Sequence, residues 1–140
     1  MTAYLVFAAI RDGKLDPAAT VAVSEKAWRA GGSRMFIEPR KPVTVSDLLR
    51  GMIVQSGNDA TIALTEAVAG SEEAFAQLMN REAKRLGLRN SNFVNSTGLP
   101  APNHYATARD MAVLAAALIR DFPDRYALYS QKEYTWNGIK

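Results

Sequence analysis

The chain is organised around residues 52–60, which read Met52-Ile53-Val54-Gln55-Ser56-Gly57-Asn58-Asp59-Ala60. Two segments with helical patterns flank the turn-forming residues in the middle of this stretch. In an extended or turn conformation, side chains two residues apart project to the same side, so Ser56 and Asn58 can point into one pocket. A hydroxyl and a carboxamide placed together suit a proton relay and the binding of a substrate amide. Three such residues between helices can equally form only a turn, so the local pattern leaves both interpretations open.

The sequence on either side of this stretch predicts helices. Thr44 and Asp47 have the spacing of a capping box, which predicts a helix over residues 44–55. Asp59 lies in the first turn of a helix predicted over residues 59–69, where the backbone dipole favours negative charge. Gly57 is expected to relax the backbone between the two helices. Apolar spacing and capping residues predict three more helices, over residues 1–11, 71–87 and 107–122.

Strand signals are few and short. Residues 20–23 are β-prone, and residues 35–37 are predicted to form a second short strand that pairs with them. Pro39 and Pro42 exclude a long central strand in this region. Residues 132–136 alternate as an exposed edge strand would. The sequence therefore predicts a mainly α-helical chain with little sheet.

Composition narrows the possible functions. The 140 residues fit one domain, and 48% hydrophobic with 22% charged residues is ordinary for a globular protein. The net charge of +3 is dispersed, which argues against a nucleic-acid partner. The absence of cysteine and the single histidine, His104, argue against metal or thiolate chemistry, so no metal and no cofactor are expected. Residues 1–10 are apolar but lack the basic flank of a signal peptide.

Seven short segments occur in the order and spacing of a known family. They are Ser33-x-Met35-Phe36, Leu48-Leu49-Arg50-Gly51, Ser56-Gly57-Asn58-Asp59-Ala60, Leu86-Gly87-Leu88, Gly98-Leu99, Tyr105-Ala106-Thr107-Ala108-Arg109-Asp110-Met111 and Glu133-Tyr134-Thr135-Trp136-Asn137-Gly138. Over essentially the whole chain, this pattern resembles the low-molecular-mass penicillin-binding proteins, and among them the serine-type D-alanyl-D-alanine carboxypeptidases. The resemblance implies the β-lactamase/transpeptidase-like fold, in which helices pack on an antiparallel sheet. Residues 1–140 would be the helical subdomain of a partial domain, with most sheet strands absent.

The resemblance also implies a chemistry that needs three motifs in one cleft. A Ser-x-x-Lys supplies the nucleophile and base, a Ser-x-Asn loop relays a proton and holds the substrate, and a Lys-Thr-Gly strand binds the substrate carboxylate. Only the middle motif occurs here, so Ser56 would be the relay hydroxyl and Asn58 the substrate-holding amide, both catalytic and substrate-binding. The chain is expected to begin just after the first motif and to end before the last. As given, it is expected to be inactive.

The resemblance further implies partners and a location. The substrate would be a peptidoglycan stem peptide ending in D-Ala-D-Ala, cleaved through an acyl-serine, and β-lactams would be trapped as acyl-enzymes in the complete enzyme. The parent protein would act in the periplasm or otherwise outside the cytoplasm, with membrane attachment only through segments absent here. Because sheet partners of the apolar helices are absent, self-association of the chain is also expected.

Two alternatives stay open. The first is a relative of the serine β-lactamases, which have a similar helix–loop–helix motif. Comparing the hydrolysis of a D-Ala-D-Ala peptide with that of a cephalosporin distinguishes a peptidase from a β-lactamase. A catalytically silent helical interaction domain would not be labelled by fluorescent penicillin. His104 is interpreted as a loop residue rather than a general base, because the family chemistry needs no histidine.

Overall fold

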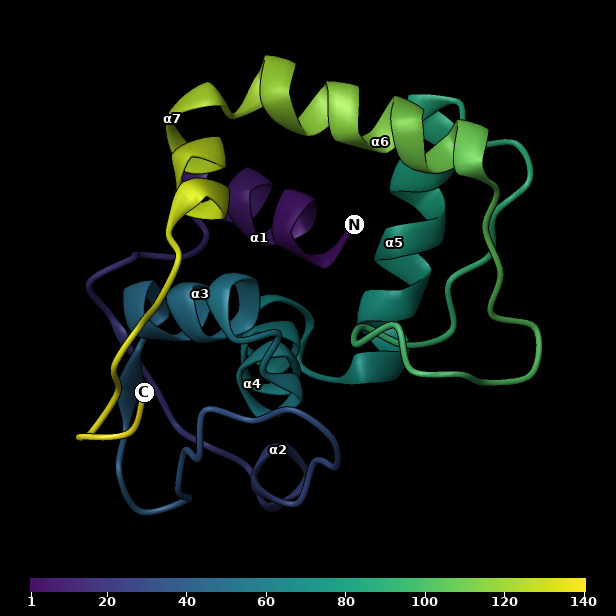
Figure 1. The fold of residues 1–140 in the computed structure, drawn as a ribbon. Helices are drawn as coiled ribbons and strands as arrows, with labels where there is room; N and C mark the ends of the chain where they lie inside the picture. The colour runs from purple at the N-terminus through teal and green to yellow at the C-terminus, as the bar shows by residue number, and fades with distance from the viewer.

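The structure, a computed structural model that describes residues 1–140, consists mainly of helices packed around α1. Figure 1 shows α1 at the centre of the molecule, with α6 above it, α5 to one side, and α3 and α4 below. The longer helices are α1 (Thr2–Arg11), α3 (Val45–Val54), α4 (Asn58–Ala69), α5 (Glu72–Leu86) and α6 (Ala108–Asp121). The short elements are α2 (Glu25–Trp28), α7 (Pro123–Tyr126), the 3-10 turn η1 (Ala127–Ser130), and the strands β1 (Thr20–Val21) and β2 (Val43–Thr44). The predicted mainly α-helical class is confirmed.

The helices begin where their capping residues predict. The Thr44 hydroxyl accepts a hydrogen bond from the Asp47 N–H at 3.1 Å and starts α3. Ser71 and Thr107 cap α5 and α6 in the same way. Each side-chain oxygen satisfies one of the backbone donors that a helix start leaves without a partner, so these caps fix the register of their helices.

One hydrophobic core of 25 buried residues joins the helices. Tyr4 and Phe7 of α1 pack against Phe122 at the end of α6, with ring centroids 5.0 and 5.7 Å apart. The Tyr4 hydroxyl donates to Asp121 Oδ2 at 2.8 Å, so the polar end of this buried ring has a partner. The apolar helix predicted at residues 1–11 is thus largely covered by this chain. No helix combines the length and the apolar character that crossing a membrane would require.

The predicted strand at residues 35–37 is wrong. β1 pairs instead with β2, antiparallel, with Thr20 opposite Thr44 and Val21 opposite Val43. Residues 35–37 lie in a loop whose backbone N–H groups donate to the Asp59 carboxylate. A strand there would need the same N–H groups for its ladder, so the carboxylate replaces the sheet partner.

The predicted edge strand at residues 132–136 is also wrong. This segment runs beside α3, where the Gln55 side chain donates to the Tyr134 carbonyl at 2.8 Å and the Tyr134 hydroxyl donates to Asp47 at 2.7 Å. Trp136 bridges only to Ile139. Side chains of α3 therefore bind this segment in place of a neighbouring strand.

The buried face of α6 includes a carboxylate. Asp110, Leu114 and Ala117 are buried, whereas Met111 and Ala115 are exposed. The Asp110 carboxylate turns inward because it accepts hydrogen bonds from the Asn90 N–H and the Ser91 hydroxyl. A polar contact thus sets the orientation of this helix, and apolar spacing alone could not predict it.

Candidate active site

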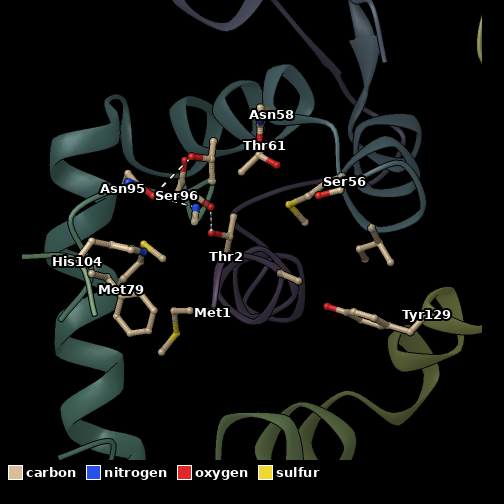
Figure 2. Close-up of a pocket in the computed structure, with 16 residues that line it drawn as sticks. Met1, Thr2, Ser56, Asn58, Thr61, Met79, Asn95, Ser96, His104 and Tyr129 are labelled. Carbon is tan, nitrogen blue, oxygen red and sulfur yellow. Dashed lines mark hydrogen bonds between the residues drawn. The ribbon is translucent and has the colours of Figure 1, made fainter. Parts of the chain in front are cut away.

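A cavity of about 310 Å³ collects residues from several separate parts of the chain. Its walls come from the start of α1, the end of α3, the start of α4 and the loop that contains residues 93–98, with Met79 of α5, His104 and Tyr129 of η1. In Figure 2, Ser56 lies on one side of the cavity and Asn95 with Ser96 on the other, with Thr2 of α1 between them. Ser56 and Asn58 both line this cavity. The structure therefore brings together the two predicted site residues.

Ser56 connects α3 to α4 in an uncommon backbone conformation. Its φ is +53°, in the left-handed region that costs a non-glycine residue about 1–2 kcal/mol. Its side chain is exposed to the cavity and the solvent. Such strain at a turn is typical of functional sites, where the surrounding structure holds the residue in place.

Gly57 has a different role from the predicted one. Its φ is −69°, which any residue can adopt, so it does not relax the backbone. A side chain at Gly57 would instead approach the Gly51 carbonyl to 3.1 Å and an Asp59 oxygen to 3.2 Å. Glycine therefore suits a position where the 31–37 loop, α3 and α4 pack closely together.

Asn58 begins α4 and is almost fully buried, with 7% of its surface exposed. Its backbone N–H donates to the Ser33 carbonyl at 2.7 Å, and its side-chain Nδ2 donates to the Gly31 carbonyl at 2.8 Å. The second Nδ2 hydrogen and Oδ1 are not used by the Gly31 contact. The carboxamide therefore has one fixed hydrogen bond and retains donor and acceptor capacity at the cavity.

Asp59 was predicted only as a charge at the start of a helix, and the sequence did not reveal its further contacts. It is 1% exposed, and its two oxygens accept hydrogen bonds from the N–H groups of Met35, Phe36 and Ile37 at 2.9, 2.9 and 3.1 Å. It also accepts from the Ala60 N–H at 2.9 Å. An acidic residue beside the motif was the only sequence signal, and nothing in the sequence indicated which loop it would bind.

The opposite wall is held by a chain of polar contacts. Thr2 donates to the Ser96 carbonyl at 2.7 Å, and the Ser96 hydroxyl and N–H donate to one Glu72 oxygen at 2.7 and 3.2 Å. The other Glu72 oxygen lies 3.2 Å from the Lys26 ammonium. Burial raises the pKa of Glu72, but the Ser96 hydrogen bonds and Lys26 outweigh it, so this pKa lies below its ordinary value. Glu72 lies in the first turn of α5.

His104 lies in a loop, as predicted, and it also lines the cavity. Its Nδ1 accepts a hydrogen bond from the Val94 N–H at 3.0 Å, and its ring packs edge-on against Phe93. This nitrogen is therefore engaged in holding the loop. No group of three or more potential metal ligands occurs in the structure.

The site as a whole contains a hydroxyl and an amide without an activated nucleophile. Neither a Ser-x-x-Lys nor a Lys-Thr-Gly sequence occurs in residues 1–140. An acyl-transfer reaction needs a nucleophile within hydrogen-bonding distance of a base. The geometry present here offers the Ser56 hydroxyl and the Asn58 carboxamide to a ligand in the cavity.

Comparison with known proteins places this arrangement in a family. The D-alanyl-D-alanine carboxypeptidase family matches residues 1–140. D-alanyl-D-alanine carboxypeptidase DacC of Escherichia coli is 47% identical over 146 residues, which cover 100% of this chain and 36% of the relative. The chain thus spans little more than a third of this relative's length.

Solved structures agree with this result. The D-alanyl-D-alanine carboxypeptidase DacD from Francisella tularensis matches with a TM-score of 0.95 and 44% identity, over 98% of this chain and 33% of that one. Penicillin-binding protein D2 from Listeria monocytogenes, solved in the cefotaxime-bound form, matches with a TM-score of 0.84 and 26% identity, over 99% of this chain and 57% of that one. Sequence and fold agree along the full length of this chain, which therefore belongs to the D-alanyl-D-alanine carboxypeptidase family.

Proposed function

We propose that residues 1–140 form the helical part of a penicillin-binding, transpeptidase-like domain that removes the terminal D-Ala from peptidoglycan stem peptides. Ser56 relays a proton during acyl transfer, and Asn58 holds the substrate amide. The observation that carries this proposal is the position of both side chains on one cavity, with the Asn58 carboxamide fixed at one end by Gly31. A fixed amide can orient a peptide bond without first losing conformational freedom, which favours productive binding.

The nucleophile, base and carboxylate anchor of the reaction come from sequence motifs that residues 1–140 do not contain. In this proposal the 140-residue chain is not acylated by itself. β-Lactams bind the complete site as substrate mimics, and the cefotaxime-bound form of the Listeria relative supports this part of the proposal. The same substrate class places the complete protein outside the cytoplasm, where peptidoglycan lies.

A chimera tests the proposal. Residues 1–140 replace the matching segment of E. coli DacC, so that the relative supplies the remaining segments. We expect the chimera to be labelled by fluorescent penicillin and to hydrolyse a D-Ala-D-Ala peptide in preference to a cephalosporin. Ser56→Ala in the chimera should slow acylation by about 100-fold or more, the usual contribution of a proton-transferring group, with little change in melting temperature.

The isolated chain is the matched control. Mass spectrometry after incubation with benzylpenicillin should show no adduct, because loss of the nucleophile alone costs on the order of 10⁶ in turnover in a serine hydrolase. A stoichiometric adduct on the isolated chain, or equal labelling of the chimera and its Ser56→Ala variant, would contradict the proposal.

A further inference from the structure

The 31–37 loop and the start of α4 bind each other in both directions. The Gly31 carbonyl accepts a hydrogen bond from the Asn58 side-chain Nδ2, and the Ser33 carbonyl accepts one from the Asn58 backbone N–H. In return, N–H groups of residues 35–37 donate to the Asp59 carboxylate. The Asn58 carboxamide is therefore bonded to the same loop that Asp59 binds at three consecutive residues.

Gly32 shows how closely the loop fits around the amide. Its φ is +74°, and a Cβ atom built there would lie 2.7 Å from Asn58 Nδ2. Real Cβ atoms essentially never approach a heavy atom so closely. A side chain at this position would force the Asn58 carboxamide or the loop to shift, so the loop packs closely against the amide.

The loop also contains a strained residue that Asp59 holds directly. Phe36 has a φ of +66° and is 49% exposed, so neither its backbone conformation nor burial of its ring favours this arrangement. Its N–H donates to Asp59 Oδ2 at 2.9 Å. A bulky residue in the left-handed region persists only where its surroundings hold it, and such strain concentrates at functional sites.

Burying a carboxylate requires compensation. A charge that is 1% exposed loses most of its hydration, and only well-placed donors offset that loss. Asp59 receives four backbone N–H groups, three from the loop and one from its own helix. No cation lies within salt-bridge distance of it, so the loop backbone is its main partner.

We propose that Asp59 is the positioning residue of the Ser56–Asn58 site: its carboxylate holds the 31–37 loop, and the loop in turn fixes the direction of the Asn58 carboxamide. The catalytic consequence of this positioning rests on the proposed function. The positioning itself is a property of the fold and can be tested without any activity.

The first test uses nuclear magnetic resonance on the 140-residue chain. The Asn58 side-chain amide is assigned by its loss in Asn58→Ser, and its hydrogen exchange is followed in Asp59→Asn, which keeps the shape but replaces one acceptor oxygen by a donor. We expect exchange of the Asn58 Nδ2 hydrogens to accelerate by up to about tenfold, the effect of losing one ordinary hydrogen bond. Gly32→Ala should shift the same resonance without altering the carboxylate.

Asp110→Asn is the matched control. Asp110 is also a buried first-turn aspartate that binds a loop, but it does not contact the 31–37 loop. We expect the Asn58 amide to be unchanged in this variant. The proposal would be overturned if the Asn58 amide exchanged at the wild-type rate in Asp59→Asn, or if its exchange accelerated equally in Asp110→Asn. It would also be overturned if this amide were unprotected in the wild-type chain.

A second test measures the consequence in the DacC chimera. Asp59→Asn should slow acylation by benzylpenicillin while the dissociation constant of the initial complex changes little, and Asp110→Asn should leave both unchanged. An Asp59→Asn chimera that is acylated at the parent rate would overturn the role in the site. A chimera that is not acylated at all would instead contradict the proposed function, and the resonance experiment would still decide whether Asp59 positions the amide.

Discussion

Two loops lie on either side of the site, and they are held in different ways. The 31–37 loop beside Asn58 is bound by a single carboxylate, that of Asp59, through three consecutive backbone N–H groups. The loop of residues 90–105 across the cavity is bound at several points along its length. Asp110 accepts from its first residues, Asn80 makes two hydrogen bonds to Phe93, and Glu72 accepts two from Ser96. The 31–37 loop thus places three hydrogen bonds on one carboxylate, in addition to its contacts with Asn58 and the bond from the Ser33 hydroxyl to the Gln55 carbonyl. The hydrogen bonds of the 90–105 loop are instead spread over several residues.

The difference has a physical consequence. Hydrogen bonds that share one acceptor group are lost together, so removal of that group leaves several buried donors without partners at once. Distributed hydrogen bonds are lost one at a time, and the remaining ones still hold the loop. Asn58, whose carboxamide we propose to hold the substrate, contacts the 31–37 loop.

The largest effect expected from this comparison is that of Asp59→Ala. We expect the free energy of unfolding to fall by about 3–4 kcal/mol, because the buried N–H groups of three residues lose their acceptor. Asp110→Ala should cost clearly less, since the other contacts of the 90–105 loop remain. Urea unfolding monitored by circular dichroism measures both values. Equal losses would mean that the two loops are held alike, contrary to the comparison.

A second prediction concerns the contact of the 31–37 loop with α3. Gly51 lies inside that helix, where alanine would ordinarily stabilise by about 1 kcal/mol. A Cβ atom at Gly51 would overlap the buried Met35 side chain, so we expect Gly51→Ala to destabilise by about 1–3 kcal/mol instead. Urea unfolding of Gly51→Ala and wild type shows whether the free energy of unfolding falls or rises. In a double-mutant cycle with Met35→Ala, the penalty should shrink, and a penalty that persists unchanged would argue against this contact.

The smallest expected effect is a pH-dependent change in stability on replacing Glu72, which binds the 90–105 loop through Ser96. The pKa of Glu72 is lower in the folded chain than its ordinary value of 4.5, so its contribution to stability is present above that value. The contribution is lost as the pH falls through the lower, folded pKa. Glu72→Gln should therefore reduce stability by about 1 kcal/mol at pH 7, the value of an ordinary hydrogen-bonded contact. The difference from wild type should vanish at strongly acidic pH.

Other carboxylates, such as Asp110 and Asp121, also have lowered pKa values, so their protonation likewise destabilises the folded protein on acidification. The quantity to compare is therefore the difference between the melting temperatures of Glu72→Gln and wild type at each pH. A difference that is constant down to the most acidic condition would show that the charge of Glu72 does not contribute.

Features of this protein that depend on neighbouring residues can be predicted from the sequence. Caps at Thr44, Ser71 and Thr107, with apolar spacing behind them, set the helices, because a helix start needs only nearby acceptors and one apolar face. The Ser56 and Asn58 pair was also visible from the sequence, since its order and flanking segments are local features.

Features that depend on residues far apart in the chain follow only from the folded structure. Residues 35–37 have the composition of a strand but form a loop, because the carboxylate of Asp59, 22–24 residues away, takes their N–H groups. The left-handed conformation falls on Ser56, whereas at Gly57 a Cβ atom would lie only 3.1–3.3 Å from atoms of three segments. Local propensities amount to fractions of a kcal/mol per residue, and a buried carboxylate with several backbone donors outweighs them.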